Sequence, residues 1–195
     1  MIFLIKHRWY LSLAATLVGA AAAWLLGVRD GIRFDHLSLL QQIVLGLAGG
    51  IAALVINFVL HTILKTAMGT PYLDAFERHG RAVLGRMRWP HYILGGLMAA
   101  LAEEPLFRGA LLGAFDHPAP GVAIAALAFG ALHWMSPKFF PFWLWAVWEG
   151  VFLGILMVAT GSVLVPMIAH GVHDVAAYKA FEVLFREGDQ PRSGV

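Results

Sequence analysis

The chain alternates between long apolar runs and short polar breaks. A helix that crosses the hydrocarbon core of a bilayer needs about 20 largely apolar residues, and most of these runs meet or approach that length. The pattern predicts an all-α fold, a polytopic membrane bundle of about six transmembrane helices. The expected helices cover residues 9–28, 37–64, 91–115, 121–134, 139–160 and 163–185.

The segments outside these six helices carry more specific expectations. The run at 9–28 follows basic residues, as a signal peptide would, but it ends without a small-residue cleavage site and is interpreted as an uncleaved anchor. The polar, arginine-rich stretch at 65–90 predicts a loop that could include a short helix on the membrane surface. Residues 186–195 predict a short, disordered polar tail. Residues 1–195 are therefore interpreted as a single transmembrane domain.

Composition supports the membrane assignment. Hydrophobic residues make up 59% of the 195 positions and charged residues 13%, against roughly 25% charged in a soluble domain. The mean hydropathy is +0.73. A net charge of +2 gives no reason to expect nucleic acid as a partner, and the absence of cysteine excludes disulfides and thiol nucleophiles.

The distribution of basic residues predicts the orientation. Lysine and arginine gather before the first run, at 65–90 and near the C-terminus, which favours cytoplasmic placement of both termini. We expect an integral protein of a prokaryotic inner (cytoplasmic) membrane.

Three of the apolar runs carry motifs of ionisable residues at helical spacing, and a charged side chain at bilayer depth costs roughly 2.5 to 3.5 kcal/mol on insertion scales. In the third run, Glu104 and Arg108 are four residues apart, so a helix places them on one face as an ion pair. Glu103 points about 100° away and is left without that partner. A buried carboxylate without a partner is a candidate general base.

The fourth run ends at His133, and the sixth contains His170, His173 and Asp174. His170 and Asp174 share a helix face, whereas His173 is left between a structural and a functional interpretation. A bundle that gathers Glu103, His133, His170 and Asp174 would hold the groups of a hydrolase that activates water.

Other polar residues in the runs receive structural interpretations. Asn57 and His61 are expected to form hydrogen bonds between helices. Glu149, in mid-span among tryptophans, is assigned no role.

The motifs together resemble the CPBP family of intramembrane endopeptidases, which includes the CAAX prenyl protease type 2, bacteriocin-processing and immunity proteins and Abi proteins. They are Glu-Glu-Pro-Leu-Phe-Arg-Gly at 103–109, Phe-Gly-Ala-Leu-His at 129–133, residues 160–170, and His-x-x-x-Asp at 170–174. The resemblance covers about residues 91–178, which would be the catalytic core.

The resemblance implies a role for each motif. Glu103 would be the general base, His133 would bind and orient the water, and Glu104 and Arg108 would support the site. His170 and Asp174 match a final motif thought to stabilise the oxyanion. Because Asp174 replaces the asparagine of the CAAX protease, it would instead orient His170 or remain protonated. The substrate would be a membrane-anchored protein or peptide.

Two questions remain open in the sequence. Glutamates and histidines could hold zinc, but no His-Glu-x-x-His motif is present, so a mechanism without metal or other cofactor is favoured. The alternative functions are a proton- or ion-coupled transporter and a catalytically silent binding or immunity protein. A transporter needs a continuous polar path, and the scarcity of charge in the second and fifth runs argues against one.

Overall fold

The computed structural model describes residues 37–84, 89–134 and 136–186, together with Ala14, residues 17–19 and Ala21. The interpretations of the first run as an anchor and of residues 186–195 as a tail fall almost wholly outside this part of the chain and remain predictions. Within the described residues every regular element is a helix, which confirms the all-α fold class.

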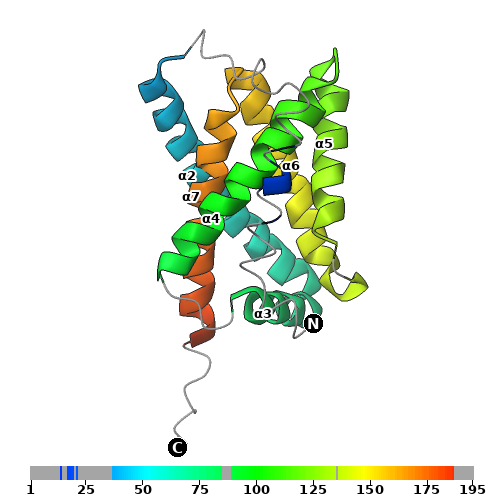
Figure 1. Ribbon diagram of the computed structural model, residues 1–195. Helices are drawn as coiled ribbons and strands as arrows, with labels where there is room; N and C mark the ends of the chain where they lie inside the picture. The colour runs from blue at the N-terminus through cyan, green and yellow to red at the C-terminus, as the bar shows by residue number, and fades with distance from the viewer. Residues whose placement is uncertain are drawn as a thin grey trace, which may run out of the picture.

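The helices form a bundle whose long members run side by side (Figure 1). In chain order they are α2 (Leu39–Met68), α3 (Thr70–Leu84), α4 (Trp89–Glu104), the π-helical turn η2 (Pro105–Leu111), α5 (Pro118–Leu132), the 3-10 turn η3 (Pro137–Phe139), α6 (Phe140–Thr160) and α7 (Leu164–Arg186).

Two of the described helices, α2 and α6, are long and apolar enough to cross a membrane, with mean hydropathies of 2.5 and 1.8. Helix α5 is apolar but shorter. These apolar helices fit a membrane protein. The number of six crossings stays a prediction.

The stretch at 65–90, expected to be a loop that could include a short helix, is helical over most of its described length. Helix α2 continues to Met68, and α3 occupies residues 70–84, lying crosswise at the lower end of the bundle (Figure 1). The physical reason is amphipathic spacing. Tyr72, Ala75 and Phe76 are buried, whereas the charged side chains between and after them, such as Asp74 and Glu77, are exposed.

A polar contact fixes α3 to the bundle. The hydroxyl of Tyr72 lies 2.8 Å from Nδ1 of His61 on α2, within a group of aromatic rings that includes Phe76 and Trp145. Burial raises the pKa of the Tyr72 phenol, so the hydroxyl keeps its proton at neutral pH. The expectation that His61 forms a hydrogen bond between helices is confirmed.

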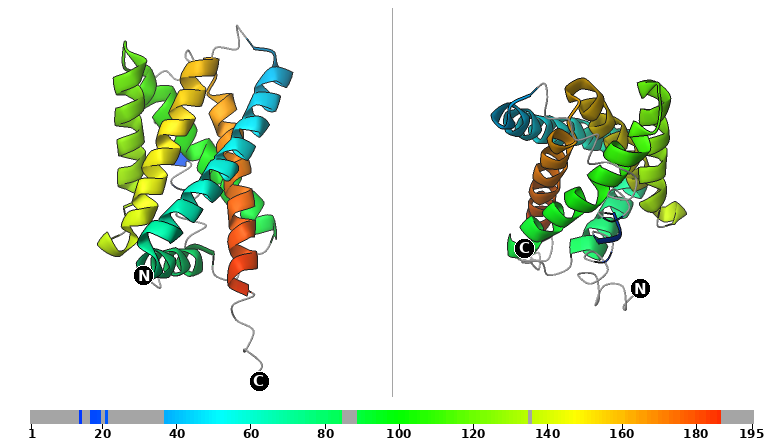
Figure 2. Two further views of the ribbon diagram at one scale, coloured as in Figure 1. Left: turned by 180° about the vertical axis from the view of Figure 1, so that it is seen from behind. Right: turned by 45° about the horizontal axis from the view of Figure 1, so that its top comes forward.

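Helix α7 is the central element, since it packs against α2, α3, α4 and α6. Figure 2 shows α2 and α7 crossing side by side. Glycines permit this approach. A Cβ on Gly50 of α2 would lie 2.8 Å from Cβ of Val172, and one on Gly96 of α4 would lie 3.0 Å from the carbonyl oxygen of Gly171. The glycines of α2 and α4 thus lie where neighbouring helices approach most closely.

Candidate active site

The third apolar run changes its winding where Pro105 follows Glu104. Helix α4 ends at Glu104, and the next seven residues form η2. Proline has no amide hydrogen to donate to the preceding turn, and π-helical turns are frequent at functional sites. The helix therefore widens at Pro105 and does not end there. On either side of it, Glu104 and Arg108 are fully buried.

Glu104 and Arg108 form the ion pair that their spacing predicts. Nη1 of Arg108 donates to Oε1 of Glu104 at 2.8 Å. Nη2 donates to the carbonyl oxygen of Gly150 on α6 at 3.3 Å, and the guanidinium lies 4.6 Å from the ring centroid of Phe129 on α5. One arginine thereby joins η2 to α4, α5 and α6.

His170 on α7 lies between carboxylates. Its Nδ1 is 2.7 Å from the same Oε1 of Glu104 that accepts from Arg108. Its Nε2 is 3.6 Å from Oδ2 of Asp174 and 4.0 Å from Oε2 of Glu103. Because carboxylate oxygens accept and do not donate, each ring nitrogen of His170 faces an acceptor. The structure therefore brings Glu103, Glu104, Arg108, His170 and Asp174 into one cluster.

Glu103 differs from its neighbour in exposure and in partners. Its side chain is 27% exposed, whereas that of Glu104 is 0% exposed. The 4.0 Å separation from His170 is too long for a direct hydrogen bond. The two adjacent carboxylates thus have different environments. That of Glu104 is buried in an ion pair, and that of Glu103 is accessible to solvent.

His133 approaches Glu103 from the end of α5. Its Nδ1 lies 2.8 Å from the carbonyl oxygen of Phe129, so in the neutral ring Nδ1 carries the proton and Nε2 can accept a hydrogen bond. His133 is exposed, and Glu103 interacts electrostatically with it as well as with His170. Glu103 of the third run thus lies within electrostatic range of the histidines of the fourth and sixth runs.

A second part of the cluster was not predicted from the sequence. Nδ1 of His173 lies 2.7 Å from Oε1 of Glu149 on α6 and 3.3 Å from Oδ1 of Asp174. On the other side of the ring, Nδ2 of Asn57 on α2 lies 2.7 Å from Nε2. The hydrogen bond between helices expected of Asn57 is confirmed. The signal for Glu149 was the energetic cost of a lone carboxylate in mid-span, but no sequence pattern indicates its partner.

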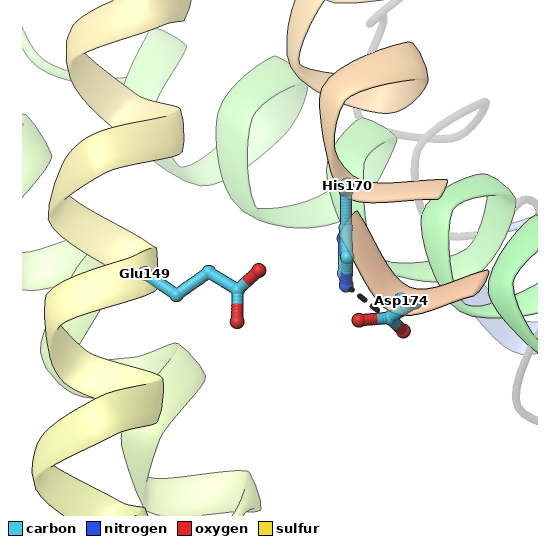
Figure 3. A group of neighbouring side chains, drawn as sticks. All are labelled: Glu149, His170 and Asp174. Atoms are coloured by element: carbon cyan, nitrogen blue, oxygen red, sulfur yellow. Dashed lines mark ion pairs between the residues drawn. The ribbon is translucent and has the colours of Figure 1, made fainter. Parts of the chain in front are cut away.

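Glu149, His170 and Asp174 could together hold a metal ion. Each can offer one ligand atom, and these atoms lie within 4.8 Å of one another. Figure 3 shows the carboxylate of Glu149 extending from α6 towards His170 and Asp174 on α7. Three ligands of this type leave a coordination position open, as catalytic zinc requires. The same groups already form ion pairs with one another or with His173.

The chemistry available at the cluster is that of proton transfer and charge stabilisation. A reachable carboxylate lies beside two imidazoles, and the second carboxylate holds one imidazole in place. Such a set can deprotonate water and stabilise negative charge on a substrate oxygen.

Comparison with known proteins places these residues in context. The chain is similar to the uncharacterized protein YpbD of Bacillus subtilis (strain 168), with 32% identity over 94 residues, which are 48% of this chain and 47% of that protein. The chain thus aligns with about half of its curated relative. No solved structure matches it.

A family model matches the part of the chain that contains most of the cluster. The matched residues are 85–176, and the model describes the Rce1-like type II CAAX prenyl endopeptidases. The match includes α4, η2, α5 and α6 and extends through Asp174 of α7. With its acidic pair, both histidine motifs and the arginine in place, the segment 85–176 is similar to the Rce1-like type II CAAX prenyl endopeptidases.

Proposed function

We propose that the protein is an intramembrane endopeptidase that hydrolyses a peptide bond of a membrane-associated protein or peptide with water activated by Glu103. The observation that carries the proposal is the position of Glu103, a reachable carboxylate 4.0 Å from Nε2 of His170 beside a fully buried Glu104–Arg108 pair. The match to the endopeptidase family supports the same reaction class.

The proposed reaction begins with a water molecule between Glu103 and the imidazoles. A separation of 4.0 Å is one that a single water can bridge. Glu103 takes a proton from this water, and the resulting hydroxide attacks the carbonyl carbon of the scissile bond. Nε2 of His133 accepts a hydrogen bond from the water and so orients it.

His170 supplies charge stabilisation in the second half of the reaction. In the imidazolium form of His170, Nδ1–H donates to Glu104, and Nε2–H is left to stabilise the oxyanion of the tetrahedral intermediate. The C–N bond then breaks, and the proton held by Glu103 passes to the leaving amine. The products are a carboxylic acid and an amine, and no covalent intermediate with the protein forms.

Replacement of Glu103 by glutamine tests the function. The amide keeps the shape of the side chain but cannot accept the proton, so we expect turnover to fall by about two to four orders of magnitude. The substrate is found by quantitative mass spectrometry of membrane proteins from cells that carry either the native protein or E103Q. We expect at least one membrane-associated chain to lose its trimmed terminus in the variant.

The control for this comparison is Asp74→Asn, which removes an exposed carboxylate on α3, away from the cluster. It leaves trimming unchanged. Purified protein must then cleave a synthetic peptide that spans the identified site. If E103Q cleaves that peptide at the native rate, Glu103 is not the base. If no membrane chain changes, the silent binding or immunity protein becomes the better description.

A further inference from the structure

We propose that Asn57, His173 and Glu149 form a positioning relay that fixes the carboxylate of Asp174 and, through it, the ring of His170. This inference deepens the proposed function and rests on it for its catalytic consequence. The relay draws one residue from each of α2, α7 and α6. Asn57 lies outside the segment 85–176 that matches the family.

Asn57 is the first member of the relay. Its Nδ2 lies 2.7 Å from Nε2 of His173. An amide nitrogen can only donate, so Nε2 accepts, and the proton of the neutral ring belongs on Nδ1. A hydrogen bond at one imidazole nitrogen determines which tautomer is present at the other. Asn57 therefore selects the tautomer of His173.

The proton on Nδ1 points towards two carboxylates. Oε1 of Glu149 is 2.7 Å away and Oδ1 of Asp174 is 3.3 Å away. Within the described residues Oε1 of Glu149 has no hydrogen-bond partner, so its negative charge acts on the dipole of the neutral ring, whereas the contact with Asp174 is a hydrogen bond. Glu149 thus holds the ring electrostatically from α6 while Nδ1–H is directed to Asp174.

Asp174 transmits this constraint to His170. One of its oxygens, Oδ1, contacts His173, and the other, Oδ2, lies 3.6 Å from Nε2 of His170. The hydroxyl of Tyr178 donates to Oδ2 at 3.4 Å. Because both oxygens are engaged, the plane of the carboxylate is defined. The same Nε2 of His170 is the group that faces Glu103.

The burial of these groups makes the arrangement costly to break. The side chain of His173 is 9% exposed, and those of Glu149 and Asp174 are each 15% exposed. Removing one partner would leave the others desolvated without compensation. Hydrogen bonds to both oxygens of Asp174 restrict the motion of its carboxylate for this reason. A rigid support is what a residue that must stabilise an oxyanion requires.

Nitrogen NMR of the histidine rings tests the relay without any substrate. Protein labelled with ¹⁵N-histidine is reconstituted in nanodiscs, and the signals of His170 and His173 are assigned by removing each residue in turn. In the native protein we expect His173 to show the tautomer protonated at Nδ1. In Asn57→Leu we expect that signature to be lost and the ring signals of His170 to shift.

The matched control is Thr62→Val, on the same helix. Thr62 is exposed, and its hydroxyl donates only to the carbonyl of Phe58 in its own helix, so both imidazole signals stay in place. Unchanged His170 signals in Asn57→Leu would overturn the relay. Because this measurement needs no turnover, it gives its answer even if the protein is not a peptidase.

Two replacements of His173 provide the catalytic test on the peptide identified with E103Q. Asparagine keeps a donor near the position of Nδ1, whereas glutamine keeps one near the position of Nε2. We expect His173→Asn to retain more activity than His173→Gln, with kcat of the glutamine variant about tenfold lower or more and KM nearly unchanged. Equal losses in the two variants, or losses confined to KM, would show that His173 only packs the bundle.

Discussion

Arg108 gives the two neighbouring glutamates, Glu103 and Glu104, different environments. It donates to Glu104 and to the carbonyl of Gly150 from a fully buried position. Its charge is therefore matched by Glu104, and Glu103 keeps its own oxygens available. A base that was already paired with a guanidinium would hold its negative charge too tightly to accept a proton.

Replacing Arg108 with alanine removes the partner of a fully buried carboxylate. Breaking one half of a buried ion pair costs about 3 to 5 kcal/mol, so we expect the variant to assemble poorly and to lose activity. The free energy of unfolding in detergent micelles measures the first effect. Arg108→Lys keeps the charge but presents a compact ammonium in place of the planar fork, and we expect an intermediate loss.

The comparison of the two variants separates charge from geometry. If Arg108→Lys were as unstable as Arg108→Ala, the fork and its contact with Gly150 would matter more than the charge. A stable and fully active Arg108→Ala variant would contradict the assignment of the pair as a support of the site.

At the scale of helices, the contact between α2 and α7 sets the position of the relay. A Cβ on Gly50 would come within 2.8 Å of Val172 and 2.9 Å of the carbonyl oxygen of Ala169. Asn57 is two helical turns further along α2 and reaches His173 across the same contact. The distance between the two helix axes therefore controls both packing and the hydrogen bond.

Replacing Gly50 with valine tests whether the distance between the two helix axes determines the hydrogen bond. Overpacking of a tight contact costs roughly 1 to 3 kcal/mol, so we expect a lower free energy of unfolding and a weaker Asn57–His173 bond. Gly113→Val is the matched control, because a Cβ at Gly113 meets nothing within 4 Å. A thermal unfolding midpoint that falls equally in both variants would assign the loss to helix propensity alone.

The contacts that the sequence predicted are those set within one helix. The four-residue spacings of Glu104 with Arg108 and of His170 with Asp174 follow from helix geometry. The contacts of Glu149 and Asn57 with His173 depend on how α2 and α6 are rotated against α7. No local pattern encodes that rotation, because it results from the packing of small side chains along the whole interface.

The boundaries of the helices, like the side-chain contacts, could be predicted only in part. Pro105 predicted a change in α4, since proline disrupts the regular hydrogen bonds, but the widened π-helical form was not predictable from one residue. Likewise, the arginines of α3 favoured the interpretation as a loop, although its buried face has helical spacing.

For the molecule as a whole, the choice between metal and metal-free chemistry is open to direct measurement. Glu149, His170 and Asp174 can approach one ion, yet in the proposed mechanism each forms an ion pair that a cation would disrupt. We expect purified protein to contain less than stoichiometric zinc by elemental analysis. Its peptidase activity survives treatment with 1,10-phenanthroline.

The contrary result is equally informative. Stoichiometric zinc, together with activity that chelation abolishes and zinc alone restores, would make the three side chains ligands. In that case Glu149→Gln would release the metal as well as reduce turnover. A control with a non-chelating phenanthroline isomer excludes inhibition by the aromatic compound itself.

One consequence follows from the fact that His170, His173 and Asp174 all belong to α7. Their partners Glu104, Glu149 and Asn57 are distributed over three other helices. A small rotation of α7 about its long axis would separate all three pairs of side chains at the same time. Such a rotation would inactivate the site in one step, without a partly active intermediate.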